Sequence, residues 1–132
     1  MVDINNAVEA AQELATEISP APVAFDRKTA PADIQARLNW GAPALTILDV
    51  RDRDSFNTER IMGAVSMPLP VVVERAQNTL EADREIYLYG VDDAESAKAA
   101  QKLQDAGFKA VSMIDGGLQA WKLANCPTEG RV

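Results

Sequence analysis

Three carboxylates stand close together at a point where an apolar segment gives way to a helical one. Residues 86–89 are apolar, and Asp92, Asp93 and Glu95 follow them just before an alanine-rich stretch with helical spacing. A loop between a strand and a helix is a common place for chemistry, because the first N–H groups of the helix point into the loop and stabilise an anion there. Neighbouring carboxylates can also exchange protons with a substrate or hold a hard divalent cation.

The same carboxylates fit a simpler role in capping the helix. Asp92 stands at the N-cap, and Glu95 follows it by three positions, which is the spacing of a capping box. Acidic residues near a helix N-terminus stabilise the helix by about 0.3–1 kcal/mol. We favour capping, with an acidic docking surface as a compatible alternative. A cation site is disfavoured, because the positive helix end opposes a bound cation. The candidate site is the whole loop, which consists of Gly90, Val91, Asp92, Asp93, Ala94, Glu95 and Ser96.

Any thiol chemistry of the chain rests on one residue. Cys126 is the single cysteine, and the chain contains no histidine. A single cysteine excludes an internal disulfide bond, and without histidine we expect no transition-metal site. We therefore predict no metal and no cofactor. Cys126 has no histidine or lysine motif beside it, and a lone cysteine of this kind is usually a small apolar filler.

Composition and charge indicate an acidic globular protein. The length of 132 residues suits one domain with a single core. The net charge of −7 counts against binding to nucleic acid, whose phosphates require a basic surface, and against binding to anionic membranes. No apolar run approaches the roughly 18 residues that span a bilayer. The N-terminus lacks the basic region and apolar core of a signal peptide. We therefore predict no membrane insertion and a cytoplasmic location.

The N-terminal part is predicted to form an amphipathic helix outside the main domain. Apolar residues fall at helical spacing over 3–18, and prolines at positions 20 and 22 end the segment. We therefore divide the chain into an N-terminal helical extension at 1–20 and one domain at 21–132. We expect the extension to serve attachment or partner contact, with docking on its own domain as the alternative.

From residue 23 onward, predicted strands alternate with predicted helices. Thr29 is predicted to cap the first helix of the domain, and Gly107 to end the longest one. The predicted strands are 23–25, 44–49, 64–67, 85–89 and 110–114, and the predicted helices are 31–39, 52–59, 71–80, 94–106 and 117–123. The alternation indicates an α/β fold: a mainly parallel sheet of about five strands with helices on both faces.

Several motifs of this chain, taken in their order and spacing, resemble those of a rhodanese (sulfurtransferase) domain. They are the segment 47–56 with its Asp-Val-Arg sequence, the Ile-x-Gly-Ala segment at 61–64, and the Asp-Gly-Gly sequence at 115–117 followed by Trp121. The resemblance covers roughly residues 22–130. It implies the rhodanese fold for this part of the chain.

The resemblance also implies a cysteine at the end of the middle strand, where the family carries a persulfide. Gly90 occupies that position here, and glycine has no side chain to hold sulfur. The family has an arginine-serine pair five and six positions later, whereas this chain has Glu95 and Ser96. Asp92 and Asp93 add further negative charge, which repels the anions that such a loop collects. Relatives of the fold that act as dual-specificity phosphatases need the same cysteine and arginine.

Two residues of the first motif are expected near the same place. The resemblance implies that Asp49 and Arg51 order loops at the rim of the active site. The alternative, which we favour, is that they tie the end of a strand to neighbouring loops.

We therefore predict a catalytically inactive rhodanese-like domain that acts as a protein-binding or regulatory module and is a monomer or a weak dimer. Three alternatives stay open: a sulfurtransferase that uses Cys126, a carboxylate-based enzyme at the loop 90–96, and a sensor that binds a cation or small ligand at the acidic residues of that loop.

Overall fold

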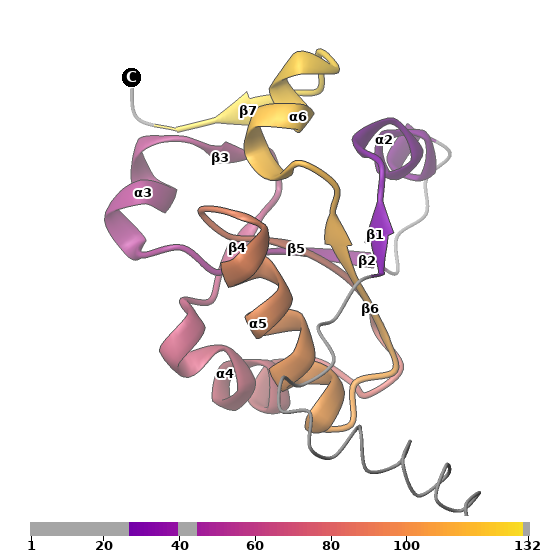
Figure 1. Ribbon diagram of the computed structural model, residues 1–132, viewed down its shortest axis with the longest axis vertical. Coiled ribbons are helices and arrows are strands. Elements are labelled where there is room, and N and C mark those ends of the chain that lie inside the picture. Colours follow the sequence, from indigo (N-terminus) through magenta and orange to yellow (C-terminus); the bar gives the residue numbers. More distant parts are fainter. Residues whose placement is uncertain (1–26, 40–44, 131–132) are drawn as a thin grey trace, which may run out of the picture.

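Parallel strands form the centre of the computed structural model, which describes residues 27–39 and 45–130 (Figure 1). The main sheet has five strands in the order β1-β6-β5-β2-β4, and each neighbouring pair is parallel. These strands are β1 (Lys28–Thr29), β2 (Leu45–Asp49), β4 (Val65–Ser66), β5 (Glu85–Tyr89) and β6 (Ala110–Ile114). The predicted α/β class and five-stranded parallel sheet are confirmed.

Helices cover both faces of the sheet. They are α2 (Pro31–Asn39), α3 (Arg53–Thr58), α4 (Val72–Thr79), α5 (Asp93–Asp105) and α6 (Gly117–Leu123), with a 3-10 turn, η2, at Leu69–Val71. On one face, Leu88 belongs to a buried cluster with Val72 of α4 and Leu103 of α5. On the other face, Tyr87 belongs to a cluster with Ile34 of α2 and Trp121 of α6. Successive residues of β5 thus enter different clusters, which explains why the strand is apolar from Ile86 to Tyr89.

The longest helix begins and ends as its sequence predicts, to within one residue. Its apolar face is buried at Ala99, Ala100 and Leu103 and half-buried at Ala106. Gly107 follows with a φ of 103°, a left-handed conformation that glycine adopts without strain. Its N–H and that of the next residue bond back to the last helical turn, which is the Schellman pattern.

One predicted cap is wrong. Thr29 lies in β1, paired with Ile114 of β6, and its Oγ1 is 2.7 Å from Oγ of Ser112. The helix that follows instead begins from Ala30, whose carbonyl accepts the N–H groups of Asp33 and Ile34. Pairing with β6 has taken the threonine out of the capping position.

A second, antiparallel sheet was not predicted. It consists of β3 (Arg60–Ile61) and β7 (Thr128–Glu129). Strands of two residues carry too little periodicity to be recognised in a sequence. The pairing places the C-terminal end of the described chain beside the segment that follows α3 (Figure 1).

The predicted helix at 3–18, the predicted strand at 23–25 and the domain boundary at residue 20 lie outside the described residues, so they stay predictions. Within 27–39 and 45–130, no helix is long and apolar enough to cross a membrane.

Candidate functional site

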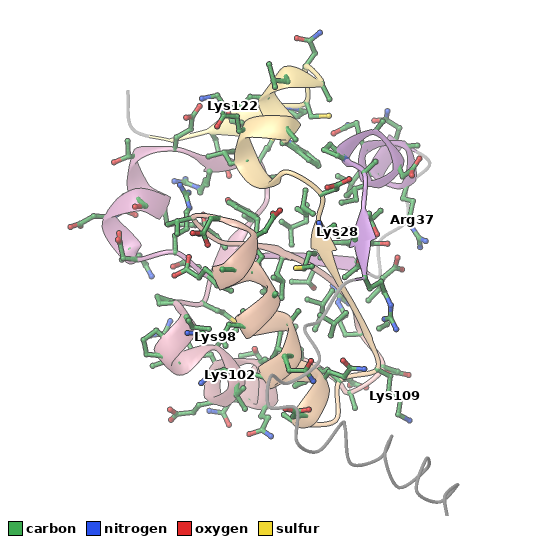
Figure 2. All side chains as sticks on the ribbon, in the orientation of Figure 1. Lys28, Arg37, Lys98, Lys102, Lys109 and Lys122 are labelled. Carbon is green, nitrogen blue, oxygen red and sulfur yellow. The ribbon has the colours of Figure 1, made fainter. Side chains whose placement is uncertain are left out.

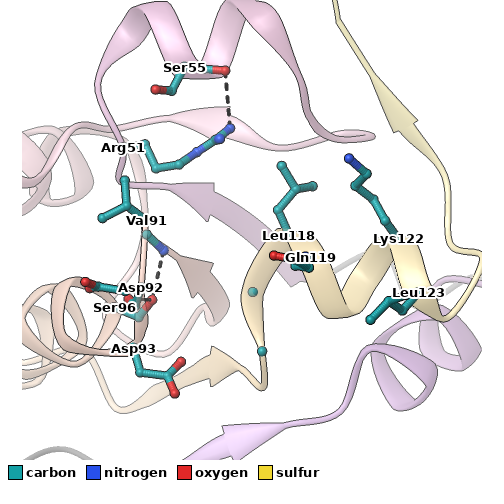
Figure 3. A pocket seen from close by; sticks show the side chains of 13 residues that line it. Arg51, Ser55, Val91, Asp92, Asp93, Ser96, Leu118, Gln119, Lys122 and Leu123 are labelled. Carbon is teal, nitrogen blue, oxygen red and sulfur yellow. Dashed lines mark hydrogen bonds between the residues drawn. The ribbon is translucent and has the colours of Figure 1, made fainter.

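A pocket of about 520 Å³ opens where the carboxyl ends of β2 and β5 approach α6 (Figure 3). This edge of an open parallel sheet is where ligands bind in α/β proteins. The pocket is lined by Arg51, Ser55, Gly90, Val91, Asp92, Asp93, Ser96, Gly116, Gly117, Leu118, Gln119, Lys122 and Leu123. It therefore brings together most of the candidate loop with one residue of the predicted rim.

Asp92 caps helix α5, as the capping-box spacing predicts. Its backbone is extended, and its Oδ1 accepts the N–H of Glu95 at 2.8 Å. The partner carboxylate differs from the expected pattern. Oε1 of Glu95 accepts the N–H of Val91 at 2.7 Å, one residue before the N-cap, rather than the N–H of Asp92 itself. Two backbone donors of the loop are thus occupied by carboxylates of the same loop.

Gly90 is held between two side chains of α5. Its N–H donates to Oγ of Ser96 at 2.8 Å (Figure 3), and that hydroxyl donates to the carbonyl of Asp92 at 3.0 Å. A Cβ placed on Gly90 would lie 2.7 Å from Oε1 of Glu95 and 3.0 Å from Cβ and Cγ of Glu95. The glutamate therefore fills the space in which any side chain at position 90 would begin.

Asp49 and Arg51 form a largely buried ion pair at the wall of the pocket. Asp49 is fully buried, and its Oδ2 is 2.6 Å from Nη2 of Arg51. The same Nη2 donates to the carbonyl of Glu59 at 2.6 Å. Burial alone would lower the pKa of Arg51, but the hydrogen bond and charge of Asp49 outweigh it and raise that pKa. The pair links the end of β2 to the segment after α3, and only Arg51 of the two lines the pocket.

Sequence reasoning missed Tyr89, the last residue of β5. Tyr89 is fully buried, its ring lies 5.3 Å from the guanidinium carbon of Arg51, and its hydroxyl oxygen accepts the N–H of Ile61 at 3.0 Å. Burial and the neighbouring Asp49 carboxylate raise the pKa of Tyr89, so the phenol stays protonated at neutral pH. A tyrosine that ends an apolar strand was the available signal, since its hydroxyl requires a partner when buried.

Sequence reasoning also did not place helix α6 beside the candidate loop. Gly116 is the N-cap of this helix and Gly117 its first residue, and both have a positive φ, of 79° and 60°. A Cβ on Gly116 would lie 2.4 Å from the Cβ of Ala120, so the turn requires glycine. Leu118 and Lys122 of this helix lie across the pocket from the loop that follows β5 (Figure 3).

The cations of the pocket already have acidic partners. Nζ of Lys122 lies 2.9 Å from Oε1 of Glu59, and this hydrogen bond lowers the pKa of Glu59. The more distant pair of Lys28 and Asp93 is 3.8 Å apart and largely exposed. Figure 2 shows the labelled cations spread over the view, from α6 at the top to the segment between α5 and β6 at the bottom.

Cys126 lies outside this constellation. It is not among the residues that line the pocket, and its Sγ is 3.8 Å from the carbonyl oxygen of Ala124. Burial raises the pKa of the Cys126 thiol. A nucleophilic cysteine requires the opposite shift, because the thiolate is the reactive form. In the described part of the chain, no group of three or more histidine, cysteine or acidic side chains is arranged to hold a metal ion.

The chain is similar to known proteins in both sequence and structure. The family model described as "Rhodanese-like domain" matches residues 30–124. Thiosulfate sulfurtransferase GlpE of Coxiella burnetii is 32% identical over 84 residues, which cover 64% of this chain and 77% of the relative. The uncharacterized protein YqhL of Bacillus subtilis is 32% identical over 75 residues, which cover 57% of this chain and 59% of YqhL. The crystal structure of the Alr3790 protein from Anabaena sp. is similar with a TM-score of 0.77 and 47% identity, over 79% of this chain and 93% of that one.

Proposed function

Because this chain belongs to the rhodanese-like domain family, we propose that it is a member without sulfurtransferase activity that works as a protein-binding module. One observation carries the proposal. At the end of β5, where the family resemblance implies a persulfide-bearing cysteine, the chain has Gly90, and the side chain of Glu95 occupies the space of the missing one. Sulfur transfer in this family needs a thiolate at that point, and a carboxylate there cannot accept sulfane sulfur.

The electrostatics of the loop support the same proposal. A sulfurtransferase of this kind receives an anionic donor in a cradle of backbone N–H groups at a helix N-terminus. Here the N–H of Val91 is bonded to Glu95 and that of Glu95 to Asp92. The cradle is therefore filled by anions of the protein itself, which repel a thiosulfate ion.

A binding role is supported by what the chain keeps. The parallel sheet, the Asp49–Arg51 ion pair and the glycine turn before α6 still shape a pocket that is open to solvent. A concave surface with exposed side chains but without a nucleophile suits recognition rather than turnover.

The test is the formation of thiocyanate from thiosulfate and cyanide by the purified chain, with GlpE of Coxiella burnetii as the positive control. We expect no rate above that of a reaction without protein. A rate that is clearly higher would overturn the proposal. If Cys126→Ser then abolished that rate, the nucleophile would be Cys126. If activity persisted in that variant, the carboxylates of the loop would become the candidates.

A further inference from the structure

Exposed aliphatic side chains stand on two walls of the pocket. Val91, in the loop after β5, is 64% exposed, and Leu123, at the end of α6, is 80% exposed. The half-buried Leu118 lies across the pocket from Val91 (Figure 3). Aliphatic side chains exposed around one concavity are typical of an interaction site, whereas single exposed ones are ordinary.

The wall of the pocket that the loop after β5 forms is negatively charged, with Asp92 and Asp93 in its lining. The cations that line it, Arg51 and Lys122, are already paired with acids at 2.6 and 2.9 Å. In contrast, Asp92 and Glu95 have no lysine or arginine within ion-pair distance in the described ranges. Asp93 has one at 3.8 Å, which is a longer contact than the other two pairs and is largely exposed, so it neutralises Asp93 only weakly.

Resting on the protein-binding function proposed above, we propose that the pocket receives a peptide segment of a partner protein in which an aliphatic residue stands next to a lysine or arginine. The aliphatic side chain packs against Val91 and Leu123, and the cation lies against Asp92. Removal of the aliphatic side chain from water supplies most of the affinity, and the charge selects and orients the partner.

Charge also disfavours two other occupants of the pocket, the N-terminal segment of this chain and a second copy of the chain. The first 26 residues contain five acidic residues and no lysine or arginine. They would bring like charge to Asp92. A second copy of the chain, with a net charge of −7, would meet the same repulsion.

The probe is a library of random dodecapeptides displayed on phage and selected against the full chain at low ionic strength. Enriched peptides are synthesised, and their affinities are measured by fluorescence polarisation. Leu123→Ser removes an aliphatic wall. Met62→Ser is its matched control, because Met62 is 48% exposed but lines a different hollow. Asp92→Asn removes the charge and keeps the helix cap, since asparagine caps as well as aspartate.

We expect enriched peptides that carry an aliphatic residue beside a lysine or arginine. Leu123→Ser should weaken their binding about tenfold, and Met62→Ser by less than about twofold. Asp92→Asn should weaken binding several-fold and reduce its dependence on salt. Enrichment no greater than on a bare support, peptides without this pattern, or equal losses for Leu123→Ser and Met62→Ser would overturn the inference.

The thiocyanate assay on the same preparation separates the two proposals. Turnover of thiosulfate would refute the proposed function whichever peptides bind. Absence of turnover together with absence of peptide enrichment would refute the docking inference alone.

Discussion

The loops that follow β2 and β5 are built alike and yet hold their charges in different ways. Asp52 caps α3 by accepting the N–H of Ser55 at 2.8 Å, and Asp92 caps α5 by accepting the N–H of Glu95 at the same distance. The two strands are neighbours in the sheet, with Asp49 opposite Tyr89 at their ends. The two caps thus start from the same edge of the sheet.

The difference lies in a second acid beside each cap. At the end of β2, Asp49 is fully buried and is held by Arg51. In the loop after β5, Glu95 is half-buried and is held by a backbone N–H. A buried carboxylate needs a cationic partner, because the loss of hydration is large, whereas a partly exposed carboxylate at a helix N-terminus is satisfied by the backbone. One loop therefore ties elements together, and the other fills its own anion cradle.

The largest effect is expected from the buried pair. Asp49→Ala leaves the Arg51 guanidinium without its acid, and we expect the free energy of unfolding to fall by about 3–5 kcal/mol. Glu95→Ala is the matched change in the other loop and should cost about 1 kcal/mol. Urea denaturation measures both. If the two variants lost similar amounts, the contrast between the loops would be wrong.

A cysteine introduced at position 90 tests whether the carboxylates of the loop suppress thiol chemistry there. In a Cys126→Ser background, Gly90→Cys alone should give a sluggish thiol and little thiosulfate turnover, because Glu95 crowds the new side chain and nearby carboxylates raise its pKa. Adding Glu95→Arg, Asp92→Asn and Asp93→Asn should lower that pKa, and alkylation by iodoacetamide at neutral pH should become about tenfold faster.

The alkylation rates of the single and combined variants are compared across a range of pH. Turnover by Gly90→Cys alone at a rate like that of GlpE would show that neither the crowding nor the charge of the loop matters. The proposed inactivity of the chain would then rest on the absence of a sulfur atom at position 90 alone.

The two caps should respond alike when they are removed. Asp92→Ala is expected to lower the free energy of unfolding by about 1 kcal/mol, and Asp52→Ala should cause a similar fall. The asparagine variants at both positions should remain close to the parent protein. Thermal or urea unfolding of the four variants measures this. A clearly unequal loss between the two alanine variants would mean that the caps are not equivalent.

The smallest expected effect concerns the stability of the fold at low pH. The hydrogen bond from the Ser55 backbone holds the pKa of Asp52 below its ordinary value of 3.8. A carboxyl whose folded-state pKa is lowered contributes stability above its unfolded pKa and loses it as the pH falls through the folded value. Asp52→Asn should therefore flatten, slightly, the loss of stability below about pH 4. Circular dichroism melting curves at stepped pH measure the slope, and identical slopes for the variant and the parent would contradict the prediction.

Several elements followed from the sequence because their signals are local. The bounds of β5, β6 and α6 agree with the predicted 85–89, 110–114 and 117–123. Continuous apolar runs, paired glycines and an aspartate before a helix act over a few residues, so neighbouring residues suffice to predict them. The proposed equivalence of Gly90 with the cysteine of the rhodanese family rests in the same way on motif and spacing.

The tertiary structure alone decided what surrounds those elements. The path of the loop places Glu95 where a side chain at position 90 would begin. The packing of α6 on the sheet places Leu118 and Leu123 opposite this loop. The hydrogen bond from Arg51 to the carbonyl of Glu59 could not be predicted from the sequence either. Such contacts join segments that are brought together by packing of the core, and no local pattern of residue types records which segments will meet.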